Sequence, residues 1–335
     1  MTVCRVDFET RSDVDLRVHG SARYFASPHW KALIMCYQLP GEAVKTWTYR
    51  DVECPADLAA HIRAGGRLAA FNANFEMQCF DEQAARFGWP RPAVEQYVCT
   101  AVAAAAMSLP RSLEAVGEAL NLPVQKDKSG SDLIKFFSIP VRRLKRHAHL
   151  PPGPIFNDPE EHPEQFAAFC RYCAIDVQTE AAVAERIFPL RPEDQAMYTL
   201  DQVINSRGMR VDLESIDAAI VMAEKAKAKL EAELIDVTGG YVTGINKSAE
   251  MCAWLRSQGV ETDSVAKDVV ADLLELEDIP AAARRVLEIR QQGAKSSTAK
   301  LEAFRERVSA DGRVRHAFIF NAAGPGRWSS RGVQL

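Results

Sequence analysis

The sequence predicts an α/β domain with a mixed sheet in the first half of the chain and a mainly helical segment in the second half. Short strand-like apolar runs alternate with helix-like segments as far as the turn Pro189-Leu190-Arg191-Pro192, and after this turn almost every segment reads as a helix. The chain has 335 residues, enough for two domains that each bury a core. We therefore expect one domain over 1–190 and a second over 191–335.

In the first domain, expected strands and helices alternate. Residues 3–9 alternate between apolar and polar side chains, and 68–72 is an apolar run typical of a buried strand. The expected strands are 2–9, 32–39, 43–49 and 67–72. The expected helices are 55–64, 74–87, 97–107, 112–121, 131–137 and 163–187. Residues 138–163 contain six prolines, which predicts an irregular loop.

The second domain is expected to consist mainly of helices. They lie at 193–206, 213–237, 248–258, 266–277 and 280–308. Between the first two of these, 207–212 reads as a turn followed by a short strand. Residues 312–320 read as a further strand near the end of the chain.

Composition indicates an ordinary soluble globular protein, with 47% hydrophobic and 26% charged residues. A net charge of −4 does not by itself indicate nucleic-acid binding, so such a role must depend on local basic patches. The eight cysteines lack the spacing of a disulfide framework, and the pair Cys170 and Cys173 has no second pair to complete a zinc site. We expect reduced cysteines and a cytoplasmic protein without a membrane span or signal peptide.

Two acidic residues share one face of the first expected strand. In a strand, side chains alternate between the faces, so Asp7 and Glu9 lie opposite Cys4, Val6 and Phe8. The Cα atoms of the two acids are then roughly 6.6 Å apart, and their carboxylates can converge on a hard cation such as Mg²⁺ or Mn²⁺. A solvated strand edge has the same short pattern, so a metal site is favoured only if later segments supply further acids.

Two later segments supply such acids. Asn72 or Asn74 is placed to cap the helix that begins after the 67–72 strand, and Glu76 lies in its first turn, where the helix dipole favours an anion. Tyr172 and Asp176 are four residues apart and therefore share one face of the helix expected at 163–187. Taken singly, these are an ordinary N-terminal acid and a core-edge tyrosine beside a solvated acid.

Taken in order, the three segments resemble the motifs of the DEDD 3′–5′ exonucleases, in the subclass that contains a tyrosine. The resemblance implies a ribonuclease H-like domain in which Asp7, Glu9, Glu76 and Asp176 hold two divalent cations, Mg²⁺ or Mn²⁺. It also implies that Tyr172 orients the attacking water. The chain departs from the family at Glu76, where the family usually has aspartate.

The second half resembles the thumb and the entry to the palm of family A DNA polymerases, especially phage-type relatives of bacterial DNA polymerase I. Three segments carry this resemblance, at 295–301, 311–316 and 326–331, although Pro325 replaces the usual threonine. Positions expected to contact nucleic acid are Asn72, Lys295, Ser297, Thr298 and Arg327. The sequence stops at 333–335, where the family continues into the palm, so we expect the polymerase active site to lie outside this chain, on a downstream palm and fingers polypeptide if the polymerase is split.

A basic run precedes the third acidic motif. It contains Arg142, Arg143, Lys145 and Arg146 and ends with two histidines that have no acidic neighbours to complete a metal site. Such a run is either a solvated surface or a contact for single-stranded nucleic acid near the exonuclease site.

The favoured interpretation is the proofreading 3′–5′ exonuclease portion of a DNA polymerase in replication or repair. Its partners would be a single-stranded 3′ end and a primer–template duplex, in the host cytoplasm if the protein is encoded by a phage. Two alternatives stay open: a stand-alone RNA-processing exonuclease with a helical tail, and a catalytically silent DNA-binding module, which the glutamate at position 76 would support.

Overall fold

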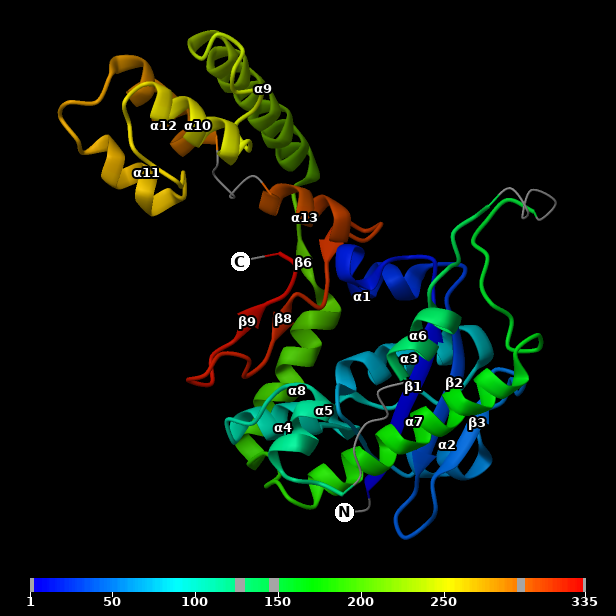
Figure 1. The fold of residues 1–335 in the computed structure, drawn as a ribbon. Coiled ribbons are helices and arrows are strands. Elements are labelled where there is room, and N and C mark those ends of the chain that lie inside the picture. Colours follow the sequence, from blue (N-terminus) through cyan, green and yellow to red (C-terminus); the bar gives the residue numbers. More distant parts are fainter. Residues whose placement is uncertain (1–2, 124–129, 145–150, 294–298, 334–335) are drawn as a thin grey trace. The chain divides into compact units, whose positions relative to one another are not determined.

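The computed structural model describes residues 3–123, 130–144, 151–293 and 299–333. The chain forms two compact units, one comprising Met1–Arg210 together with Arg307–Leu335, and the other Val211–Glu306. Figure 1 traces the chain through both. This division differs from the boundary expected at 190, because helix α8 (Pro192–Arg207) and the last part of the chain belong to the first unit.

A five-stranded mixed sheet forms the centre of the first unit, which confirms the predicted α/β class with a mixed sheet. Its strands are β1 (Val3–Arg11), β2 (Lys31–Gln38), β3 (Lys45–Thr48), β4 (Arg67–Ala70) and β5 (Tyr97–Cys99). The strand order is β3-β2-β1-β4-β5, with β2 antiparallel to β1 and β3, and β4 parallel to β1 and β5. Strand β5 was not predicted, and the helix predicted at 97–107 begins only with α4 (Thr100–Ala106). A strand of three residues is too short to show a period of two.

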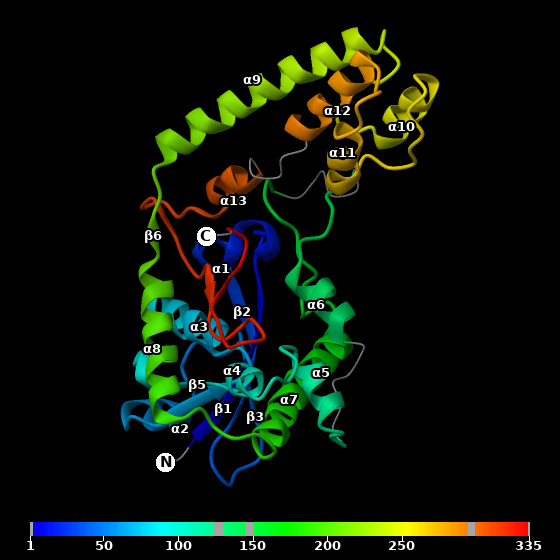
Figure 2. The same ribbon diagram turned by 90° about the vertical axis from the view of Figure 1, so that its left-hand side faces the viewer.

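Helices cover both faces of the sheet. Cys4, Val6 and Phe8 of β1 point into a core with α2 (Ala56–Arg63) and α3 (Ala73–Phe87). On the other face, the β2 side chains pack against α6 (Gly130–Ser138) and α7 (Pro163–Ala184). Figure 2 shows the sheet between these two groups of helices. The β1 face that carries Asp7 and Glu9 is therefore the one covered by α7.

Three further helical segments lie in this part of the first unit. Helix α5 (Leu113–Ala119) packs against α7, and the 3₁₀ turn Val94–Gln96 leads into β5. Helix α1 (Leu16–Ala26) was not predicted. Its Gly20 has φ 76° and ψ 169°, so the helix is interrupted and the sequence shows no continuous helical period there.

The end of the chain returns to the first unit. Strand β6 (Met209–Arg210) pairs with β7 (Arg313–Val314), and β8 (Phe318–Ile319) pairs with β9 (Ser329–Ser330). The single strand predicted at 312–320 is thus divided in two. The break falls at His316, which has φ 54° and whose backbone N–H donates to the Asn205 carbonyl of α8.

The second unit is helical in the part that the structure describes. Its helices are α9 (Leu213–Val237), α10 (Ser248–Ser257), α11 (Lys267–Leu274), α12 (Ala281–Gly293) and α13 (Ala299–Arg307) as far as Glu306. Helix α12 packs against α9 and α11 around a core that includes Trp254, Leu255 and Leu287. The helix predicted at 280–308 is described as α12 and α13, and 294–298 lie outside the described residues.

The helices of the described ranges include none that is long and apolar enough to cross a membrane. All eight cysteines carry free thiols. Six are buried, while Cys54 and Cys170 are partly exposed.

Candidate active site

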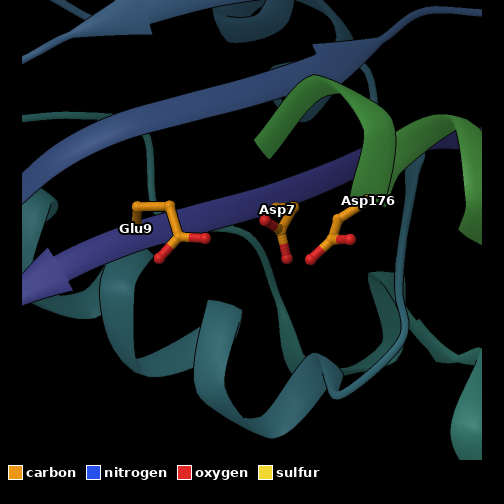
Figure 3. Close-up of side chains that lie close together, drawn as sticks. All are labelled: Asp7, Glu9 and Asp176. Carbon is orange, nitrogen blue, oxygen red and sulfur yellow. The ribbon is translucent and has the colours of Figure 1, made fainter. Parts of the chain in front are cut away.

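Three of the four predicted acidic residues meet on the β1 face that α7 covers. One carboxylate oxygen from each of Asp7, Glu9 and Asp176 lies within 4.8 Å of the oxygens from the other two. Figure 3 shows Asp7 and Asp176 facing each other, with Glu9 farther along β1. Glu9 is 8% exposed and Asp176 6% exposed, so most of this negative charge is withdrawn from water. Carboxylates gathered in this way repel one another unless a cation or protons neutralise them.

The register between α7 and β1 brings these residues together. Four residues of helix rise about 6.0 Å, close to the roughly 6.6 Å spanned by two residues of strand. With the helix antiparallel to the strand, every fourth helix residue therefore meets every second strand residue. Asp176 meets Asp7, and one turn farther along α7, Glu180 meets Arg5 at 2.7 Å. Tyr172, one turn earlier, lies toward Glu9.

The ion pair between Arg5 and Glu180 was not predicted. The side chain of Glu180 is only 4% exposed and that of Arg5 22% exposed. Thr100 donates a second hydrogen bond to the Glu180 carboxylate. The residue spacing could have indicated this pair, because Arg5 precedes Asp7 by two residues on the same strand face and Glu180 follows Asp176 by four on the same helix face. The pair fixes α7 on β1 directly beside the acidic cluster.

Cys173 also contacts the cluster and was not predicted as part of it. Its Sγ lies 3.5 Å from the Asp7 carbonyl oxygen and 3.4 Å from Asp7 Oδ2. Burial, followed by the nearby thiol of Cys36 and the charge of Asp7, raises the pKa of Cys173 well above its usual range. The thiol therefore keeps its proton at neutral pH and acts as a weak donor to Asp7.

A β-bulge lies beside the cluster. The pairing of β1 with β2 shifts between Glu9 and Thr10, which face Ile34 and Ala32, so that Leu33 is the extra residue. Bulges bend a strand and redirect its side chains. Thr10 then exchanges a hydrogen bond of 2.7 Å with Tyr24 of α1, which ties that helix to the end of β1.

Glu76 stands apart from the three clustered acids. It is 4% exposed in the first turn of α3, and its Oε2 is buried without a hydrogen-bond partner among the described residues. Burial, followed by the charges of Asp7 and Glu180, raises the pKa of Glu76 well above its usual range. Glu76 is thus close enough to feel the charge of Asp7, although its oxygens do not join the cluster of the other three acids.

The two asparagines proposed to cap α3 behave differently. Asn72 occupies the N-cap position, but its side chain makes no capping hydrogen bond. The Asn74 amide instead donates to Gln202 Oε1 at 2.5 Å and lies 3.2 Å from His316 Nδ1. Asn74 therefore connects the start of α3 to α8 and to the end of the chain.

The Tyr172 ring lies in a tight position next to the acids. It is 1% exposed and stacks with Phe169, with ring centroids 6.2 Å apart. A Cβ atom at Gly130, the first residue of α6, would overlap the ring. Burial, followed by the charge of Asp176, raises the pKa of Tyr172, so its hydroxyl stays protonated. The start of α6 thus controls where this hydroxyl points.

The site fits divalent cations. Asp7, Glu9 and Asp176 offer converging carboxylate oxygens, which are the ligands that Mg²⁺ and Mn²⁺ prefer. The Oε2 of Glu76, which is buried without a hydrogen-bond partner among the described residues, offers another oxygen in this part of the unit. A bound cation would offset both the repulsion within the cluster and the burial of Glu76.

Of the predicted nucleic-acid contacts, Asn72, Arg142, Arg143 and Arg327 are exposed. Arg143 donates to the carbonyls of Pro151 and Gly153, so it also supports the loop in which it lies. The other predicted contacts fall outside the described residues: Lys145, Arg146, Lys295, Ser297 and Thr298.

Comparison with known proteins finds similarity to DNA polymerases. No family model matches it. It is 34% identical over 340 residues to the DNA polymerase of Bacillus phage SP02, which establishes homology. That alignment covers 100% of this chain and 51% of the phage protein, so the chain spans about half the length of this curated relative.

A solved structure shares the fold. The POL domain of Pol1 from M. smegmatis, in complex with a DNA primer-template and dNTP, matches with a TM-score of 0.53 and 16% sequence identity. The match covers 98% of this chain and 51% of that chain. At this level of identity the likeness extends to the fold alone.

Proposed function

We propose that this chain is the N-terminal portion of a family A DNA polymerase and that its first unit carries a metal-dependent 3′–5′ exonuclease site. The observation that carries the proposal is the meeting of Asp7, Glu9 and Asp176 within 4.8 Å, with Tyr172 beside them. Homology to a phage DNA polymerase supports the choice of DNA as substrate. The mixed sheet supports a ribonuclease H-like assignment for residues 1–190, and 191–335 would then form the thumb and the start of the polymerase domain.

In the proposed reaction, Asp7, Glu9 and Asp176 would hold the cations, and Glu76 would complete the site from the start of α3. Two bound divalent cations would lower the pKa of a water molecule and neutralise the departing 3′-oxygen. The Tyr172 hydroxyl stays protonated, so it can donate to one group and accept from another while it orients that water. Cys173 and the Arg5–Glu180 pair hold Asp7 and Asp176 in position.

The proposed substrate is the single-stranded 3′ end of DNA, released as nucleoside monophosphates during proofreading in the host cytoplasm. Duplex primer–template would be held by the proposed thumb segment, residues 191–335. The homology to a DNA polymerase over the whole chain makes a stand-alone RNA-processing enzyme the weaker choice.

A catalytically silent DNA-binding module is the second candidate. It is favoured by the position of Glu76, whose oxygens lie outside the cluster and whose raised pKa favours a protonated, uncharged carboxyl. A site that keeps only three acids would bind the cations less tightly.

Digestion of a 3′-labelled single strand in Mn²⁺ tests the proposal. Asp7→Ala should lower the rate at least roughly 10²-fold, because changes outside the direct ligands already cost 10–100-fold. Asp81→Ala is the matched control, since this acid of α3 pairs with Arg91 instead of the cluster. Equal rates for Asp7→Ala and wild type would refute the nuclease assignment. No Mn²⁺-dependent digestion by wild type would favour the silent module, and faster digestion of structured RNA would favour the RNA-processing enzyme.

A further inference from the structure

A basic cleft lies on the first unit next to the start of α3. Its volume is about 470 Å³, and its walls come from α1, from the first turns of α3 and from the returning C-terminal segment. Three arginines line it, namely Arg17, Arg307 and Arg331. The residues that line it include no aspartate or glutamate in the part of the chain that the structure describes.

In the part of the chain that the structure describes, no ion pair joins these arginines to a carboxylate, although the backbone N–H of Arg17 donates to Asp15. Elsewhere in the first unit, arginines such as Arg86 and Arg315 pair with carboxylates. Burial, followed by the like charge of Arg331, lowers the pKa of Arg307. Burial lowers the pKa of Arg111, and the like charge of Arg331 lowers it further. Arg307 and Arg331 therefore place two like charges in the cleft, and a bound anion would reduce their repulsion.

Arg307 is held in a fixed position at the cleft. Its guanidinium donates to the Arg17 carbonyl and lies against Gly20 and Gly332. Both glycines have positive φ, 76° and 80°, and a Cβ atom at either would overlap the arginine side chain. Gly20 is also the residue at which α1 is interrupted. The two glycines thus make room for a cation whose orientation is set before any ligand arrives.

The remaining lining residues suit a nucleotide strand. Asn72 and Ser21 offer neutral polar groups, and the half-buried Phe75 offers an aromatic ring. His316 adds a ring that is uncharged at neutral pH, because burial and Arg315 lower its pKa to about 4. Arginines, amides and an aromatic ring together are the groups that bind the phosphates and bases of single strands. Phe75 directly precedes Glu76, so the cleft lies beside the candidate active site along α3.

We propose that this cleft binds the phosphate backbone of single-stranded nucleic acid, and that Arg17, Arg307 and Arg331 supply the positive charge. This proposal rests on the proposed exonuclease function in one respect, because it takes the bound strand to be the substrate of the exonuclease. The binding itself requires no cation and no catalysis. It can therefore be tested apart from the nuclease reaction.

The test is fluorescence anisotropy of a labelled 12-nucleotide oligo-dT in EDTA, titrated with the full chain at several salt concentrations. The double variant Arg17→Gln with Arg331→Gln removes two exposed arginines and should fold normally. It should bind at least about tenfold more weakly at low salt, because hydrogen bonds to charged groups are among the stronger polar contacts. The slope of log K against log salt should fall by about 0.7 for each lost phosphate contact, or about 1.4 in total.

The matched control is Arg91→Gln with Arg256→Gln, which changes the net charge equally. These arginines are exposed and pair with Asp81 and Asp263. The control should bind like wild type. Equal affinities of the two double variants, or an unchanged salt slope, would overturn the proposal. Arg307→Gln provides a separate variant, and its folding is checked by circular dichroism because this side chain is partly buried.

Two further arms identify the ligand and separate the two proposals. Competition with dTMP distinguishes a strand from a mononucleotide, and dTMP that binds as tightly as the 12-mer would overturn the strand assignment. Asp7→Asn should bind the oligonucleotide in EDTA as wild type does, because the cleft arginines are intact. Binding lost in the arginine variant and kept in Asp7→Asn supports the cleft even if the chain proves to have no nuclease activity.

Discussion

Replacing Arg5 by alanine should loosen α7 from β1 and disturb the acidic cluster that depends on their register. The Arg5 guanidinium lies 2.7 Å from Glu180 Oε2, and the Glu180 side chain is only 4% exposed. Removing Arg5 leaves a buried carboxylate with Thr100 as its main partner. Loss of one partner of a buried pair costs about 3–5 kcal/mol. Because Arg5 keeps 22% exposure, and water can enter its place, we expect about 3 kcal/mol.

The activity should fall as well. Asp176 is one helical turn from Glu180, so a small slide of α7 changes the separation of Asp176 from Asp7. A displacement of about 1 Å in a reacting arrangement can cost on the order of 10²-fold in rate. The double variant Arg5→Met with Glu180→Met should recover most of the lost stability, since paired removal of buried charges is often neutral.

Urea unfolding followed by tryptophan fluorescence measures the effect. Four of the five tryptophans belong to the first unit, and Trp254→Phe removes the contribution of the second. The matched control is Arg91→Ala, because Arg91 and Asp81 form an exposed pair that should contribute no more than about 1 kcal/mol. An Arg5→Ala variant that loses no more stability than Arg91→Ala would show that the ion pair does not set the register.

Three further predictions concern the residues around the cluster. The pKa of Glu76 is raised in the folded protein, so its ionisation increasingly destabilises the fold as pH rises above the ordinary glutamate pKa of 4.5. Glu76→Gln should therefore stabilise the metal-free protein at pH 8 and not at pH 4. Urea unfolding in EDTA measures this difference. Gly130→Ala should displace the Tyr172 ring and lower the exonuclease rate by about 10²-fold, whereas Gly117→Ala, whose Cβ would have only an ordinary contact at 3.9 Å, should leave it unchanged. Cys173→Ala removes a thiol donor and should weaken Mn²⁺ binding about tenfold in a calorimetric titration, while a serine at that position should keep most of the affinity.

Local patterns predicted the parts of the candidate site that repeat along one element. The alternation of β1 placed Asp7 and Glu9 on one face, and the four-residue spacing placed Tyr172 and Asp176 on one side of α7. Each of these patterns depends on neighbours in sequence. The face of β1 and the face of α7 could therefore be assigned before their contact was known.

Contacts between distant segments could not be predicted in this way. The ion pair of Arg5 with Glu180 depends on how α7 lies on β1, and local spacing does not fix that register. The glycine at position 20, where α1 is interrupted, leaves room for the side chain of Arg307, which comes from the other end of the chain. The pairing of β6 with β7 likewise moves the boundary between the units away from residue 190. Glu76 shows the same limit, since its helix position was predicted and its distance from the cluster was not.

The most direct test of the proposed exonuclease follows a 5′-labelled single strand on a sequencing gel in Mn²⁺. We predict that wild type shortens the strand from its 3′ end one nucleotide at a time and releases nucleoside monophosphates. EDTA should abolish this ladder, and Asp176→Asn should slow it at least roughly 10²-fold, because one acid of the cluster loses its charge. Internal cleavage, or shortening that proceeds equally fast in Asp176→Asn, would contradict the exonuclease assignment.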